Sequence, residues 1–262
     1  MTPGSDEAVL LDLKKAFSTA IPTGNVIAAR AIARAIAEHE NDAAWIKENF
    51  SQLVEEIQIA AYREYVEAER SAGEAAIIRV FTPLVDVDAT AVDTLRVVAN
   101  RFGALDKFYL GLTQGRRPRA GRAFELWIRE FFVRLGYPFT AQAAIDGQPD
   151  FVIPSVEHYR NNPMDCVVFT VKRTLRERWR QIVTEGARGL GFFLATIDEG
   201  IAARDLQEIL DSRIILVVPN RIKHSRADYA AAMNVITFEF FFEHHLDPAM
   251  RRWLASGVIG GE

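Results

Sequence analysis

A chain of 262 residues is long enough for one sizeable hydrophobic core, or for one core with a smaller helical region beside it. Hydrophobic residues make up 49% of the chain and charged residues 25%, which is typical of a globular protein and excludes a disordered one. The formal net charge of −4 argues against indiscriminate binding to polyanions, so any contact with nucleic acid must come from local basic patches.

The single cysteine and the absence of long apolar runs indicate the compartment. Cys166 has no partner for an intramolecular disulfide, which fits a reducing cytoplasm, and its apolar surroundings predict a buried thiol. The first residues, MTPGSDEA, lack the basic start of a signal peptide, and no apolar run reaches the ~18 residues that a membrane span needs. We therefore expect a cytoplasmic protein that does not contact a membrane.

The first part of the chain is expected to be helical. Apolar residues recur at helical spacing over 5–20, 24–70 and 87–112, and no motif of catalytic chemistry lies among them. The sequence pattern changes near TQGRRPRAGRAFE, where apolar residues at helical spacing give way to a basic stretch. We therefore predict an N-terminal helical region over 1–114, serving in dimerisation or as a clamp on DNA, and a second domain over 115–262.

In the second part, strands and helices alternate. An amphipathic helix is expected over 121–136, and two more helices over 174–188 and 201–211. Short apolar segments predict strands over 150–154, 166–172, 192–198, 213–220 and 235–242. This order predicts an α/β fold with a partly parallel sheet, and the doubly apolar strand RIILVVPN is expected to be central and covered on both faces.

Two strand ends carry residues suited to catalysis. Asp150 stands at the start of DFVIP, and Lys172 at the end of CVVFTVK, with the turn signal NNP between the strands. If the two strands pair as a hairpin, the carboxylate lies beside the ammonium group. Alternation then places Val167, Phe169 and Val171 on the core face of the second strand.

A carboxylate and a lysine in this arrangement suit metal-assisted hydrolysis of a phosphodiester. The carboxylate binds a hard divalent cation such as Mg²⁺, and the lysine stabilises the attacking hydroxide or the charge that develops on phosphorus. The alternative is an exposed ion pair that flanks a hairpin, and Asp150 and Lys172 alone leave both interpretations open.

Further residues give the chain a family resemblance. The stretch AGRAFELWIREFFVRLGYPFTAQ is followed by GQPDFVIP, VKRTLRERWRQI, FFLATID and RIILVVPN, which together occupy much of residues 115–242. This sequence resembles the PD-(D/E)xK nucleases, and within them the type II restriction endonucleases of the EcoRII-like, CCGG-cutting group. The resemblance implies a central mixed sheet flanked by helices, with Mg²⁺ as cofactor.

The resemblance also implies roles for single residues. Asp150 corresponds to the main metal ligand, Lys172 to the catalytic lysine and Glu125 to an upstream acidic residue near the metal. The family's usual acidic residue two positions before the lysine is replaced by Thr170. In this group that carboxylate moves to the following helix, where Glu185 stands at the family's spacing; Glu130 and Glu177 are competing carboxylates.

The segment after Lys172 is rich in arginine. Thr174 and Glu177 form a capping box, which accounts for a helix start. It does not account for cations at the positive end of that helix, where each is unfavourable by a few tenths of a kcal/mol. In the related group, an R-(D/E)-R triplet at this place reads the CC and GG dinucleotides. We therefore expect DNA contacts from Arg173, Arg176, Glu177, Arg178 and Arg180.

A second basic stretch, GRRPRAGR, precedes the catalytic region. Its arginines are expected to position the DNA backbone; the alternative is a solvated linker. These residues are Arg116, Arg117, Arg119 and Arg122. His244 and His245 lack metal-ligand spacing and are interpreted as structural, and Lys223, His224 and Arg226 as a polar loop.

Together these features predict a Mg²⁺-dependent type II restriction endonuclease that cuts double-stranded DNA at a CCGG, CCNGG or CCWGG type of site. Two strands of a symmetric site call for two active sites, so a homodimer is expected. The absence of a P-loop predicts that no nucleotide cofactor is needed. The alternatives are a structure-specific or repair nuclease of the same fold and a catalytically inactive, sequence-specific DNA-binding protein.

Overall fold

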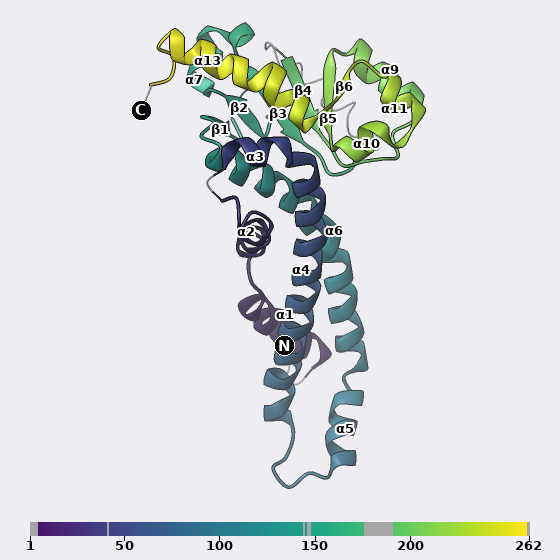
Figure 1. Ribbon diagram of the computed structural model, residues 1–262. Helices are drawn as coiled ribbons and strands as arrows, with labels where there is room; N and C mark the ends of the chain where they lie inside the picture. Colours follow the sequence, from purple (N-terminus) through teal and green to yellow (C-terminus); the bar gives the residue numbers. More distant parts are fainter. Residues whose placement is uncertain (1–4, 41, 144, 146–147, 176–190, 261–262) are drawn as a thin grey trace. The chain divides into compact units, whose positions relative to one another are not determined.

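The computed structural model describes residues 5–40, 42–143, 145, 148–175 and 191–260, and of residues 117–122 it describes the backbone alone (Figure 1). The chain forms two compact units. The helical unit contains residues 1–27 and 60–120, and the sheet unit contains residues 28–59 and 121–262. The sheet unit thus includes residues 28–59, which the sequence analysis grouped with the helical region. The assignment of separate roles to 1–114 and 115–262 stays a prediction.

The helical unit is built on three long helices. Helix α1 (Asp6–Ala20) begins at Ser5, whose hydroxyl accepts a hydrogen bond from the backbone N–H of Ala8. Its apolar stripe packs against the later turns of α4 (Phe50–Phe81) and the first turns of α6 (Phe102–Arg134). The short elements η1 (Thr82–Leu84) and α5 (Ala91–Ala99) lie between α4 and α6 in the chain. The helix predicted over 5–20 is confirmed. Over the predicted range 87–112, two helices, α5 and the first turns of α6, are separated by Asn100 and Arg101, and residues 87–90 are not helical.

Helix α6 differs from the prediction. The sequence indicated two helices separated by the basic stretch 115–122, but a single helix runs from Phe102 to Arg134. The backbone is therefore helical through GRRPRAGR, Pro118 included, and this stretch is not a linker loop. An interior proline removes one backbone hydrogen bond and crowds the carbonyl four residues before it, a cost that the 33-residue helix tolerates.

In the sheet unit, the helices α2 (Gly24–Ala35) and α3 (Ala43–Glu48) and the start of α4 precede a six-stranded mixed sheet in the order β1-β2-β3-β4-β5-β6. The first three strands are antiparallel neighbours, and the pairs from β3 to β6 are parallel. The strands are β1 (Thr140–Ala141), β2 (Phe151–Ile153), β3 (Val167–Val171), β4 (Gly191–Ala195), β5 (Ile214–Val218) and β6 (Val235–Thr237). The predicted α/β fold with a partly parallel sheet is confirmed.

Two hydrophobic clusters cover the two faces of the sheet. On one face, residues of β4, β5 and β6 form an aliphatic cluster with α9 (Ala203–Asp211), α10 (Asn220–Ser225) and α11 (Ala227–Ala231) (Figure 1). On the other, phenylalanines of the strands form an aromatic cluster with α6 and the C-terminal helices. Strand alternation assigns the side chains: Phe193 joins the aromatic cluster, and Leu194 the aliphatic one. β5 is covered on both faces, as predicted, but it is the penultimate strand of the sheet, between β4 and the edge strand β6, rather than a central one.

The last predicted strand, 235–242, is wrong beyond Thr237. β6 ends there, and α12 (Phe238–Phe241), a π-helical turn (Phe242–Leu246) and α13 (Asp247–Ala255) follow. The hydroxyl of Thr237 accepts a hydrogen bond from the N–H of Phe240 at 3.2 Å and caps the new helix. Helical spacing then directs Phe238, Phe241 and Phe242 into the aromatic cluster. In a strand, these three side chains would have been divided between the two faces of the sheet.

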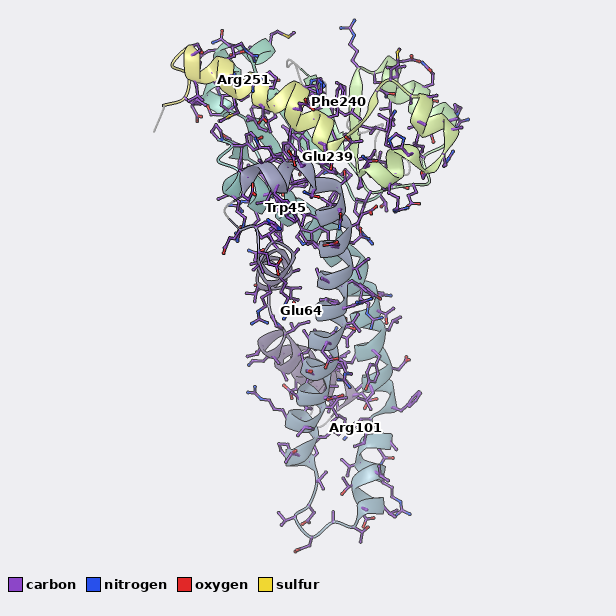
Figure 2. The ribbon with its side chains drawn as sticks, viewed as in Figure 1. Trp45, Glu64, Arg101, Glu239, Phe240 and Arg251 are labelled. Carbon is purple, nitrogen blue, oxygen red and sulfur yellow. The ribbon has the colours of Figure 1, made fainter. Side chains whose placement is uncertain are left out.

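The start of α4 is tied to this C-terminal region. The carboxylate of Glu239, which is labelled in Figure 2, accepts hydrogen bonds from the Ser51 N–H at 2.7 Å and the Ser51 hydroxyl at 2.8 Å. The same hydroxyl accepts a bond from the N–H of Asn220 at 2.9 Å. The negative charge at a helix N-terminus is favourable, and it joins α4, α10 and α12 around the aromatic cluster. Within the described ranges, no helix combines the length and the apolar character of a membrane span.

Candidate active site

The pairing of β2 with β3 brings the two predicted catalytic residues together. Phe151 lies opposite Phe169 in an antiparallel register, so Asp150, which precedes β2, lies beside the end of β3. The ammonium Nζ of Lys172 is 3.1 Å from Oδ2 of Asp150. The strands are neighbours as predicted, although their connection contains α7 (Val156–Asn161) and η2 (Pro163–Asp165) rather than a simple turn.

Three donors converge on one oxygen of Asp150, which is only 9% exposed. Besides Lys172, Oδ2 accepts a hydrogen bond from the hydroxyl of Thr170 at 2.8 Å and from the backbone N–H of Val171 at 2.7 Å. These bonds offset the loss of hydration of a buried carboxylate and fix its orientation. Among the described residues, no hydrogen bond reaches Oδ1, so this oxygen is available to a cation.

Thr170 stands two positions before Lys172, where the related family usually has an acidic residue, and its hydroxyl donates a hydrogen bond to Asp150. A second carboxylate at position 170 would share the space of the Asp150 carboxylate, whereas the hydroxyl donates to it. Sequence reasoning recognised the missing acid and did not predict this bond.

Glu125 lies beside this pair. Its side chain is half-buried on α6, and the pKa of its carboxyl is raised, first by burial and then by the negative charge of Asp150. Opposing effects come from Gln142, whose amide Nε2 is 3.4 Å from Oε1 of Glu125, and from the charges of Lys172 and Arg129. Gln142 carried no signal in the sequence; its backbone has a positive φ of 48°, in the turn between β1 and β2.

The donor set of the site fits a hard divalent cation. Two carboxylates that repel each other are the oxygen ligands Mg²⁺ prefers, and a cation between them removes the repulsion. Within the part of the chain that the structure describes, no three His, Cys, Asp or Glu side chains gather in a metal-binding arrangement. The third predicted ligand, Glu185, lies outside the described residues.

The predicted DNA contacts are described only in part. Arg176, Glu177, Arg178 and Arg180 lie outside the described residues, as do the side chains of Arg117, Arg119 and Arg122. Of the helix predicted over 174–188, only Thr174 and Leu175 are described, and neither is helical.

Arg116 lies in the helical unit, against a buried acid. Its Nε is 2.9 Å from Oε1 of Glu69, which also receives the hydroxyl of Tyr65 at 2.6 Å on its other oxygen. The hydrogen bond to Glu69, which is 4% exposed, raises the pKa of the Arg116 guanidinium. This contact links α4 with α6, and the expected role of Arg116 on the DNA backbone stays a prediction.

Two further sets of residues have structural contacts. Lys223 Nζ donates to the carbonyls of Tyr229, Ala230 and Ala232 at 2.8 to 3.0 Å, which caps the end of α11. His244 stacks on Phe240 with ring centroids 4.0 Å apart, and His245 packs on Phe193. Cys166 is buried as predicted, and burial raises the pKa of its thiol to about 12.

Comparison with known proteins gives one family model and several similar proteins. The family model described as EcoRII C terminal matches residues 89–242. The type II restriction enzyme EcoRII of Escherichia coli is 30% identical over 156 residues, which are 56% of this chain and 38% of that protein. The type II restriction enzyme SsoII of Shigella sonnei is 28% identical over 158 residues, 55% of this chain and 50% of that protein. The match thus spans half or less of either relative.

Solved structures share the fold. A metal-depleted Ecl18kI in complex with uncleaved, modified DNA superposes with a TM-score of 0.76 at 23% identity, over 95% of this chain and 86% of that one. The restriction endonuclease PspGI in a substrate DNA complex gives a TM-score of 0.61 at 20% identity, over 88% of this chain and 93% of that one. The mixed sheet flanked by helices is therefore the restriction-endonuclease fold that the sequence indicated. Because the family model covers more than half of the sequence, the chain belongs to the EcoRII C-terminal family.

Proposed function

We propose that this protein is a type II restriction endonuclease that cuts double-stranded DNA at a site containing CC/GG, with Mg²⁺ as cofactor. The observation that carries the proposal is the register of β2 on β3. It places Lys172 3.1 Å from Asp150 in a chain of the EcoRII C-terminal family, and the charges of both residues act on the carboxyl of Glu125 on α6.

Each residue of the site has a separate proposed role in hydrolysis. Asp150 through Oδ1, Glu125 and Glu185 would hold Mg²⁺, which supplies polarisation of the scissile phosphate and acidification of a bound water. Lys172 keeps two N–H donors beyond its bond to Asp150, and these can orient the attacking water or a phosphate oxygen. The hydroxyl of Thr170 and the N–H of Val171 hold the Asp150 carboxylate in one orientation.

Sequence recognition is assigned to the segment after Lys172. Arginine donates two hydrogen bonds to O6 and N7 of guanine in the major groove, and glutamate accepts from N4 of cytosine. The triplet Arg176, Glu177 and Arg178 therefore matches consecutive G·C pairs. Arg173 and Arg180, with Arg116, Arg117, Arg119 and Arg122, are proposed as contacts to the DNA backbone.

Cleavage of both strands of a symmetric site is proposed to need a homodimer. The helical unit supports this, since it exposes large apolar side chains that a second copy could cover. Those most exposed on its helices are Ile78 at 66%, Leu95 at 68% and Phe102 at 75%.

The two alternative functions, a structure-specific nuclease and an inactive DNA-binding protein, predict different results with DNA. A structure-specific nuclease of this fold would have no use for an R-E-R triplet, and an inactive DNA-binding protein would have no use for the intact contact between Asp150 and Lys172. Incubation of the full chain with a plasmid and Mg²⁺ separates the three. Discrete bands support restriction; smears or cutting confined to junctions support the first alternative, and a mobility shift without cleavage supports the second. Ca²⁺ in place of Mg²⁺ should permit binding without cutting.

A further inference from the structure

The backbone that follows Lys172 is attached to the loop that follows β4. The N–H of Lys172 donates to the carbonyl of Ala195 at 2.9 Å, which extends the parallel pairing of β3 with β4 by one residue. Three residues further on, the N–H of Leu175 donates to Oδ2 of Asp198 at 2.8 Å. Between them, the hydroxyl of Thr196 lies 3.4 Å from the carbonyl of Arg173, a long third contact.

Asp198 is itself held in place. Its second carboxylate oxygen accepts the N–H of Gly200 at 2.8 Å, and its own N–H donates to the hydroxyl of Thr196 at 3.1 Å. Its carbonyl accepts the hydroxyl of Tyr229 at 2.9 Å, and the oxygen of that hydroxyl accepts the N–H of Ile201 at 3.1 Å. Because both carboxylate oxygens and the carbonyl are bonded, the position of the Asp198 side chain is fixed relative to β4 and α11.

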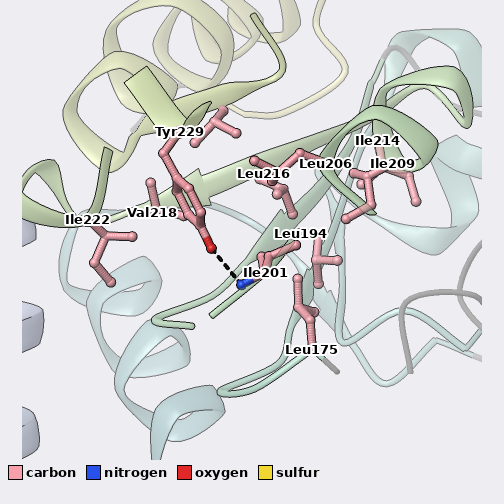
Figure 3. Packing of buried hydrophobic residues seen from close by; sticks show 11 residues of the cluster. Leu175, Leu194, Ile201, Leu206, Ile209, Ile214, Leu216, Val218, Ile222 and Tyr229 are labelled. Carbon is pink, nitrogen blue, oxygen red and sulfur yellow. Dashed lines mark hydrogen bonds between the residues drawn. The ribbon is translucent and has the colours of Figure 1, made fainter. Parts of the chain in front are cut away.

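The side chain of Leu175 secures the same point from the core. It is fully buried in the aliphatic cluster, near Leu194 and Ile201, on the same side of the sheet as Tyr229 (Figure 3). Tyr229 is also fully buried, and its bond to Ile201 crosses this cluster (Figure 3). The chain between Lys172 and Leu175 is thus held at both ends, with only two residues between them.

We propose that Asp198 is a positioning residue that fixes the backbone of Leu175, the residue before the arginine triplet, relative to the catalytic Lys172. Arg176 is the next residue after Leu175 in the sequence. Loss of the bond from Asp198 leaves the buried side chain of Leu175 as the attachment nearest to the triplet among the described residues, so base recognition by the arginines should weaken more than their attraction to phosphate. This inference rests on the proposed function, and it predicts a loss of discrimination between DNA sites.

The main test compares cleavage of a cognate duplex with a duplex in which one G·C pair is exchanged. The ratio of the two kcat/KM values should fall at least about tenfold in Asp198→Ala, the size of one lost bidentate base contact. Tyr229→Phe, which keeps the ring and removes only the hydroxyl, should lower the ratio in the same direction by less. Asp198→Asn keeps one acceptor oxygen and should restore part of the discrimination.

Asp211→Ala is the matched control. Asp211 is an exposed carboxylate at the end of α9 whose side chain accepts one bond from Gln207, so its removal should leave the ratio unchanged. A purely structural role for Asp198 would lower both kcat/KM values by the same factor. An unchanged ratio in an Asp198→Ala protein that remains folded would overturn the proposal.

Hydrogen exchange of the full chain tests the attachment without any cleavage. In Asp198→Ala the amide of Leu175 should exchange faster, while amides of β5 keep their wild-type rates. If the wild-type protein does not cut DNA but this change occurs, the proposed function fails and the attachment stands. If the wild-type protein cuts DNA and the Leu175 amide keeps its rate in the variant, the proposal about Asp198 fails and the function stands.

Discussion

The carboxylate of Asp150 serves two purposes that substitutions can separate. As a charge it is the proposed ligand of the cation, and as an acceptor it satisfies the buried N–H of Val171 and the hydroxyl of Thr170. A residue that keeps the acceptor and loses the charge should therefore affect chemistry alone, whereas loss of both should also affect folding.

The first prediction follows. Asp150→Asn retains an oxygen for the Val171 N–H and should unfold close to the wild type. Asp150→Ala leaves that N–H without an acceptor, so its free energy of unfolding should be lower than that of Asp150→Asn by about 1–3 kcal/mol. Urea unfolding of the two variants without added metal measures the difference. Equal stabilities would show that the bonds to Oδ2 contribute nothing to folding.

At this scale the sequence predicted the pair Asp150 and Lys172, because strand alternation and an antiparallel neighbour are enough to bring two strand ends together. It did not predict Thr170, Gln142 or Asp198 as partners of site residues. Their contacts depend on the register of β3 on its neighbours and on a turn with positive φ, and neither leaves a periodic pattern. The roles of Glu185 and the arginine triplet came from the family resemblance and stay predictions.

At the scale of elements, α12 shows why the last strand was predicted wrongly. The run VITFEFFF is rich in β-branched and aromatic residues, which favour strands, and it is too short for periodicity to decide. The cap at Thr237 and the fit of three phenylalanines into the aromatic cluster favour the helix. Tertiary packing therefore determines this segment more than local propensity does.

The second prediction uses two neighbours in this helix. Phe241 is fully buried between Phe169 and Phe193, so Phe241→Ala should lower the free energy of unfolding by about 3–5 kcal/mol. Phe240 is 43% exposed, and Phe240→Ala should cost about 1 kcal/mol or less. Had residues 238–242 continued as a strand, the two side chains would face opposite sides of the sheet. If Phe241→Ala and Phe240→Ala lowered the free energy of unfolding by similar amounts, this would contradict a helix in which Phe241 is buried and Phe240 exposed.

The third prediction concerns pH. Burial, and secondly the charge of His244, lowers the pKa of His245 below its ordinary value of 6.5. The unfolded chain therefore binds a proton at a higher pH than the folded one, and the free energy of unfolding should decrease as the pH falls below about 6.5. Replacement by an uncharged side chain, His245→Gln, should remove this part of the decrease. Unfolding curves for both proteins at several pH values measure it, and a constant difference between them at every pH would contradict the prediction.

For the assembled protein, the proposed homodimer would account for the proposed cleavage of both DNA strands. The α/β fold with a partly parallel sheet was predictable because strands and helices alternate after residue 140, whereas the order of the strands was not predicted. The homodimer stays a prediction, since exposed apolar residues on helices are compatible with several partners.

The fourth prediction tests the helical unit as the dimer contact. Light scattering should give the wild-type protein twice the mass of one chain, and the double variant Leu95→Glu/Phe102→Glu should give the mass of one chain, because charges cannot be buried at an apolar interface. Met233→Glu, a change at an 84% exposed position of the sheet unit, is the control and should remain dimeric. A dimeric double variant would place the contact elsewhere.

The site around Asp150 and Lys172 is proposed to hydrolyse DNA at a sequence containing CC/GG. This activity can be measured by sequencing the ends that the full chain produces from a plasmid library with Mg²⁺. The proposed function predicts that the wild-type ends share one short motif with CC and GG on opposite sides of a two-fold axis, and that Asp150→Asn produces no ends above background. Ends scattered without a common motif, or equal cleavage by the Asp150→Asn protein, would contradict it.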